Sequence, residues 1–230
     1  LRRLVGHLEQ AAQLGPQHRS DTLMHALFGH EVGHSFERKH GLSKQALELI
    51  DPAKFSIADV IHERAKSRLP DPGPGQMDLF YYALLDQLKA EEQTQFLEAL
   101  QHWLKEIACD AFGTATYGPA YFFAFVRFIQ LHGSPSDWSP KYPAGLFRLG
   151  AIIRFLDKSG YTAHLPPKAE QELVYWRERA DAHRQADVTP YQKTLEQCAL
   201  ETTEWLYDKV VSLAGAFAYN AGKFQEEVPP

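Results

Sequence analysis

Residues 27–36 constrain the fold and the chemistry of this chain more than any other stretch, because they contain the pattern His30-Glu31-x-x-His34. On an α-helix, residues four apart lie one turn apart on the same face. His30 and His34 can therefore present their imidazole nitrogens to one metal ion. Glu31 is offset around the helix, where its carboxylate can reach a metal-bound water without being a ligand. The pattern predicts a helix that carries two metal ligands and a general base.

Two glycines, Gly29 and Gly33, flank the turn of this helix that would face the metal. Glycine in a helix interior costs up to about 1 kcal/mol relative to alanine. Two of them in one motif predict the close approach of another backbone or of a substrate. Tight packing against a second helix explains them equally well.

Composition limits the class of protein. The chain has 230 residues, of which 44% are hydrophobic and 23% charged, as in globular proteins with one large or two small domains. The net charge of −5 and the lack of a basic block argue against a nucleic-acid surface. Two cysteines do not make a disulfide framework, so we expect a reducing compartment, the cytoplasm.

The ends of the chain and its apolar runs bear on the wider context. The longest apolar run, residues 120–131, is shorter than the roughly 18–20 residues of a membrane span, and Arg127 interrupts it. The chain begins with Leu1 rather than methionine. We therefore expect a processed form, or a piece of a longer protein that carries further domains.

Helical periodicity, divided by proline and glycine, predicts a mainly α fold with little β structure. We expect one helical domain over residues 1–230, with a motif core at about 20–160 and a C-terminal helical extension at about 166–220. Residues 77–112 form either two helices or one long kinked helix. The expected helices cover residues 1–14, 21–38, 43–50, 56–68, 77–89, 91–112, 120–131, 143–156, 167–184 and 190–208.

A second pair of polar residues, Glu106 and Asp110, shares one helix face four residues apart in an otherwise apolar turn. Burying two carboxylates without partners is costly, and a cation held between them and the two histidines is one explanation. A catalytic zinc usually takes three protein ligands. We therefore predict Glu106 as the third ligand and Asp110 as the acceptor of an N–H from a zinc-bound histidine. The alternatives are a solvated helix face for Glu106 and a surface ion pair for Asp110, and Cys109 is expected to be a packing residue.

The combination of these motifs resembles a known family. H-E-x-x-H followed by E-x-x-x-D is the gluzincin pattern. Residues 106–112 resemble the E-x-x-A-D-x-F segment of the CAAX prenyl proteases and heat-shock-induced membrane proteases, with Cys109 in place of alanine. That family often carries H-P-x-x-x-x-R downstream, and this chain has Tyr142, Pro143 and Arg148 in that register. The resemblance covers roughly residues 22–148. Family members carry membrane spans, and this sequence shows none.

The resemblance implies a helical, zincin-like metallopeptidase domain that binds Zn²⁺ and hydrolyses a protein or peptide substrate. Glu31 would take the proton from the attacking water and deliver it to the leaving amine. Tyr142 or Arg148 would stabilise the oxyanion or orient the site, with Tyr117 and Tyr121 as other candidates. Tyr121 and the phenylalanines that follow it are otherwise expected in the core. Two alternatives stay open: a zinc-binding but catalytically silent regulatory or protein-interaction domain, and a metal-free helical scaffold.

Overall fold

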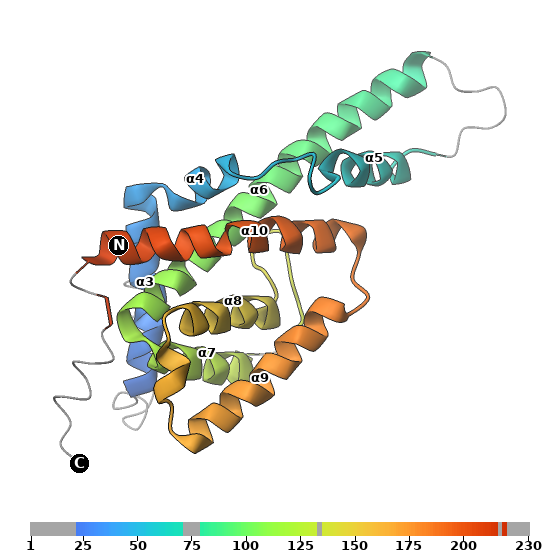
Figure 1. The fold of residues 1–230 in the computed structure, drawn as a ribbon. Coiled ribbons are helices and arrows are strands. Elements are labelled where there is room, and N and C mark those ends of the chain that lie inside the picture. Colours follow the sequence, from blue (N-terminus) through green and yellow to red (C-terminus); the bar gives the residue numbers. More distant parts are fainter. Residues whose placement is uncertain (1–21, 71–78, 133–134, 216–217, 220–230) are drawn as a thin grey trace.

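The computed structural model describes residues 22–70, 79–132, 135–215 and 218–219. Within them the chain forms eight α-helices, one 3₁₀ helix and no strand (Figure 1), so the predicted mainly α fold is confirmed. In these residues no helix combines the length and the apolar character that crossing a membrane requires. The helix expected at residues 1–14 lies outside the described residues.

The helix boundaries coincide with prolines and glycines of the sequence. Helices α7, α9 and α10 each begin with a proline, whose fixed φ and missing N–H suit the first turn. Gly41 and Gly118 adopt φ of +63° and +56° directly after α3 and α6, where a left-handed residue ends a helix. The elements are α3 (Thr22–His40), α4 (Leu42–Glu48), α5 (Ile57–Ser67), α6 (Leu79–Tyr117), α7 (Pro119–His132), α8 (Gly145–Lys158), η1 (Tyr161–His164), α9 (Pro167–Gln185) and α10 (Pro190–Ala214).

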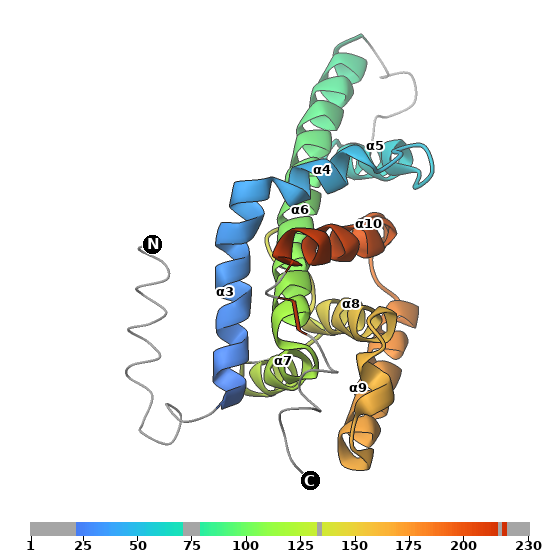
Figure 2. The same ribbon diagram turned by 60° about the vertical axis from the view of Figure 1, so that its left-hand side comes forward.

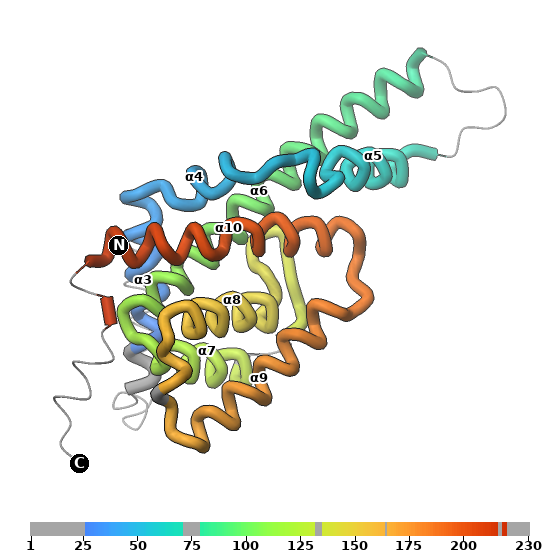
Figure 3. The backbone as a smooth tube through the Cα atoms, viewed as in Figure 1, coloured from blue at the N-terminus to red at the C-terminus, as the bar shows by residue number. Residues whose placement is uncertain are grey.

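Helix α6 is the axis of the molecule. It is one continuous helix of 39 residues, about 58 Å long at 1.5 Å per residue, which settles the choice between one helix and two. Its N-terminal end, with the end of α5 alongside, projects beyond the other helices (Figures 1 and 3). Its C-terminal half lies among α3, α7, α8 and α10 (Figure 2). That buried half carries Glu106 and Asp110.

Two apolar clusters hold the helices around α6. The larger joins α4, α5, α6, α8 and α10, with Phe96, Trp103 and Ile107 of α6 fully buried in it. The second joins α7, α8 and α9 with Ala26 of α3, and it contains Tyr121, as the sequence predicts. The indole N–H of Trp103 also donates to the carbonyl of Ser139 at 2.9 Å. This bond anchors the loop before α8 to α6, and α8 carries Arg148.

The two glycines of the motif helix are the contact points between α3 and α6. A Cβ on Gly33 would lie 2.9 Å from the Cα of Cys109. A Cβ on Gly29 would lie 2.6 Å from the ring of Tyr117 and 3.3 Å from the Cα of Gly113. Tight helix packing, one of the two explanations that the sequence left open, therefore accounts for both glycines. It brings the face of α3 that carries the histidines against α6.

Candidate metal centre

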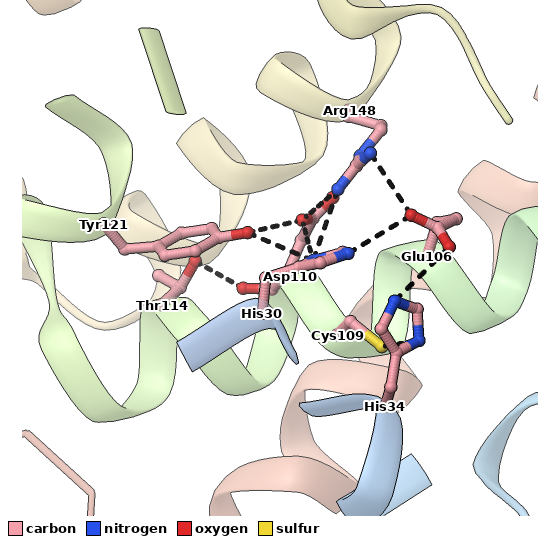
Figure 4. Close-up of polar contacts among 8 residues, drawn as sticks. All are labelled: His30, His34, Glu106, Cys109, Asp110, Thr114, Tyr121 and Arg148. Atoms are coloured by element: carbon pink, nitrogen blue, oxygen red, sulfur yellow. Dashed lines mark hydrogen bonds and ion pairs between the residues drawn. The ribbon is translucent and has the colours of Figure 1, made fainter. Parts of the chain in front are cut away.

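Three donor groups from two helices converge as metal ligands do (Figure 4). The Nε2 atom of His30 lies 3.2 Å from Oε2 of Glu106, and Nε2 of His34 lies 3.7 Å from Oε1 of Glu106. Ligand atoms around a tetrahedral zinc, with bonds of 2.0–2.2 Å, are about 3.3–3.6 Å apart. By donor type and spacing, this cluster could hold a metal ion, and imidazole and carboxylate are ligands that zinc accepts.

Asp110 contacts His30 at Nδ1, the ring nitrogen that does not face Glu106. Its carboxylate is fully buried, and Oδ1 lies 3.0 Å from Nδ1 of His30. The same oxygen accepts a hydrogen bond from the hydroxyl of Tyr121 at 2.6 Å. A neutral His30 that donates its Nδ1–H to Asp110 leaves Nε2 free as a lone-pair donor. This is the tautomer that a metal ligand needs.

Arg148 links the two acids of α6. Its Nε and Nη2 donate to the two oxygens of Asp110 at 2.8 and 2.7 Å, a bidentate pair. Its Nη1 lies 3.2 Å from Oε2 of Glu106, and the guanidinium carbon lies 4.8 Å from the ring centre of Phe125. The side chain is only 11% exposed. Arg148 therefore fixes the positions of both carboxylates.

The electrostatics of the cluster favour an additional positive charge. Burial raises the pKa of Glu106 and of Asp110, but contacts with His30 and Arg148 outweigh burial and hold both carboxyls below their usual range. Two carboxylates thus face one guanidinium. Burial lowers the pKa of His30, yet hydrogen bonds to Asp110 and Glu106 raise it to about 9. Without a metal, a proton on His30 supplies the missing positive charge.

Glu31 lies beside the ligands and is not part of the hydrogen-bonded network. Its side chain is partly buried, and no hydrogen bond engages it within the described residues. Burial and the neighbouring His30 lower the pKa of His34, while the charges of Glu106 and Glu31 act in the opposite direction. Glu31 is therefore close enough to His34 to act on it electrostatically.

Cys109 does more than the packing that its sequence predicts. Its buried Sγ lies 3.1 Å from Nδ1 of His34. The donor atoms of Cys109, His30 and His34 all lie within 4.8 Å of one another, so the sulfur is a possible ligand by distance. However, Glu106 and Cys109 face opposite ring nitrogens of His34, Nε2 and Nδ1, so one metal ion at Nε2 would lie beside Glu106. Glu106 fits better as the ligand, and Cys109 fits better as the partner that orients His34.

The three candidate tyrosines lie in different places relative to the cluster. Tyr121 reaches the centre through its bond to Asp110. Tyr117 is 38% exposed and packs on Gly29. The structure does not bring Tyr142 into the cluster: its side chain is 55% exposed, and its hydrogen bonds to Ser139 are made by the backbone. The catalytic role of Tyr142 remains a prediction.

Two residues contact the cluster more directly than the local sequence pattern indicates. Cys109 is three positions after Glu106, a spacing that places these two side chains next to each other on the helix surface. Tyr121 follows a helix break at Gly118, so no periodic pattern could relate it to Asp110.

Comparisons of the chain with models of protein families, with curated proteins and with solved structures gave no match. The gluzincin resemblance therefore rests on the motifs of this chain alone.

Proposed function

We propose that this protein is a zinc metallopeptidase of the gluzincin type that hydrolyses peptide bonds in a protein or peptide substrate. The observation that carries the proposal is the convergence of the two Nε2 atoms of His30 and His34 on the Glu106 carboxylate, at 3.2 and 3.7 Å. The motif resemblance, which rests on the same residues, agrees with it. A cytoplasmic location, which the two free and buried cysteines favour, belongs to the same proposal.

In this proposal His30, His34 and Glu106 hold the zinc ion. A bound zinc lowers the pKa of a coordinated water towards neutrality and polarises a substrate carbonyl. Glu31, which is free of hydrogen bonds among the described residues, accepts the proton of the attacking water. It then passes that proton to the amine nitrogen that leaves.

Arg148 and Tyr121 act on the ligands in this scheme. Among the described residues, the polar contacts of the Arg148 side chain go to Glu106, Asp110 and His30, so an orienting role fits it better than contact with an oxyanion. Tyr121 donates to Asp110 and thereby helps to orient His30. Both residues keep the donor atoms in place before a metal binds, which reduces the reorganisation that binding requires.

A second candidate function is a domain that binds zinc but is catalytically silent. It is favoured by the position of Tyr142, which stands where the related family has a histidine and whose side chain is 55% exposed, outside the cluster. In this candidate function the metal ligands are the same, but no substrate is hydrolysed.

Metal analysis combined with a Glu31→Gln variant tests both candidates. We expect about one zinc per chain in wild type and in Glu31→Gln. Hydrolysis of a peptide library should fall by about 10²–10⁴-fold in the variant, because the general base is lost. Glu48→Gln, at an exposed position of α4, is the matched control and should retain activity.

The other outcomes distinguish a peptidase from a silent zinc-binding domain and from a metal-free scaffold. Stoichiometric zinc with no cleavage by the wild type favours the silent domain. Absence of zinc from protein that has never met a chelator contradicts both candidates and favours the metal-free scaffold.

A further inference from the structure

A groove lies along α3 and α6, next to the turns that carry the proposed metal ligands. It has a volume of about 350 Å³ and lies between the C-terminal end of α3, the start of α4 and the middle of α6. Helices α3 and α6 are the two that carry the metal ligands, and the groove uses their neighbouring turns. Glu37 of the groove is three residues after His34, and Lys105 directly precedes Glu106.

Lys105 connects the groove with the candidate centre along α6. It directly precedes the proposed ligand Glu106 in the chain, and its own side chain lines the groove. A group bound in the groove would lie on the turns of α3 and α6 next to those that carry His34 and Glu106.

The charged side chains that line the groove differ in whether they already have a partner. The Glu37 carboxylate is 6% exposed and is already engaged, since it accepts hydrogen bonds from the hydroxyl and the backbone N–H of Ser43 at 2.6 and 3.3 Å. Arg38, Lys44 and Lys105 form no ion pair with any described residue.

Glu98 is the remaining acid of the lining, and His102 lies on the same helix. The uncommitted cations outnumber the uncommitted acid, in a chain whose net charge is −5. A concave surface with an excess of one charge raises the local concentration of ions of the opposite sign.

We propose that this groove is a substrate subsite that receives a carboxylate of the peptide, either an Asp or Glu side chain or the C-terminal carboxylate. The proposal rests on the peptidase function proposed above. Arg38, one of the cations of the groove, is four residues after His34, which is about 6 Å along the axis of α3. An extended peptide advances about 3.3 Å per residue, so the carboxylate would lie about two residues from the scissile bond.

Matched peptides test the subsite and identify the source of the carboxylate. One pair differs by Glu or Gln near the cleavage site, and a second pair differs by a free or an amidated C-terminus. We expect kcat/KM to favour one acidic member at least tenfold, mainly through KM, and the preference to weaken at high salt. The pair that shows the preference tells whether a side chain or the chain end is bound.

Charge-reversal variants test whether the groove causes the preference for the acidic peptide. Lys44→Glu should abolish or reverse the preference for the acidic member. Lys39→Glu is the matched control, because Lys39 lies in the same last turn of α3 as Arg38 but does not line the groove. Equal effects of the two variants, or equal kcat/KM for both members of each peptide pair, would overturn the subsite.

A binding measurement separates this inference from the peptidase proposal. Zinc-loaded Glu31→Gln protein is titrated into fluorescent versions of the same peptides, and anisotropy gives Kd without turnover. Tighter binding of the acidic member, lost in a Glu31→Gln/Lys44→Glu double variant, supports the subsite even if the wild type hydrolyses nothing. Turnover by the wild type with no charge preference in binding contradicts the subsite alone.

Discussion

At the scale of single residues, Asp110 is a buried charge with three polar partners. Its carboxylate is fully buried on α6 and meets His30 from α3, Tyr121 from α7 and Arg148 from α8. An unpaired charge at such a position would cost several kcal/mol or more. The three partners offset that cost, and each is thereby held in one orientation. Asp110 thus orders the side chains around it.

Cys109 provides a prediction at the same scale. In Cys109→Ala, the Nδ1–H of His34 loses its partner, and we expect zinc affinity to fall by about tenfold, the low end of the range for such outer partners. Cys109→Ser keeps an acceptor and should retain most of the affinity. Competition with a chromophoric chelator measures both. An affinity for Cys109→Ala equal to that of wild type would reduce the sulfur to a packing role.

At the scale of elements, the interface between α3 and α6 sets the geometry of the centre. Gly33 and Gly29 remove the side chains that would separate the two helices, and the atoms they meet include the backbone of Cys109 and of Gly113. Backbone atoms cannot rotate away as a flexible side chain does. The distance from His30 and His34 to Glu106 therefore depends on both glycines.

Gly33→Ala tests this dependence. The new Cβ would lie 2.9 Å from the Cα and 3.1 Å from the carbonyl oxygen of Cys109, so the helices must move apart. Overpacking typically costs about 1–3 kcal/mol, against a gain of up to about 1 kcal/mol in helix propensity. We expect a lower free energy of unfolding and weaker zinc binding. Chemical denaturation and metal titration report the two effects.

Gly150→Ala in α8 is the control for that substitution. The nearest neighbour of the new Cβ is the Cβ of Ala180 at 3.5 Å, an ordinary contact. Here the propensity gain acts alone, and we expect the stability to be unchanged or slightly higher. If Gly33→Ala behaves in the same way, close packing does not set the geometry of the centre.

At the scale of the whole molecule, the centre joins parts of the chain that are far apart in sequence. His30 and Arg148 are separated by 118 positions and lie 3.3 Å apart between Nδ1 and Nη2. The larger apolar cluster similarly joins helices from α4 to α10. A metal that bridges α3 and α6 therefore strengthens a contact on which the arrangement of the other helices depends.

Zinc should consequently stabilise the whole fold. At a free concentration of 100 Kd, a ligand that binds only the folded state adds about 2.7 kcal/mol. For a domain of this size that corresponds to a rise in Tm of about 5–10 °C. Differential scanning calorimetry with zinc and with a chelator measures the difference. His34→Ala should show no zinc-dependent shift, and a wild-type Tm that is indifferent to zinc would contradict a resident metal.

The sequence by itself determined the local features of this protein. The prolines and glycines placed most helix boundaries to within a few residues, and spacings of four placed His30 with His34 and Glu106 with Asp110 on shared helix faces. These features depend on the 3.6-residue period of the helix, which a short stretch of chain encodes completely.

Only the tertiary structure decided which faces meet. It paired Arg148 with Asp110, brought the hydroxyl of Tyr121 to the same carboxylate, placed the sulfur of Cys109 on His34 and left Tyr142 exposed on its loop. Such contacts depend on how helices pack, through the shapes of side chains from distant parts of the chain. No local period carries that information, so the groove and the full network around His30 become visible only in the folded molecule.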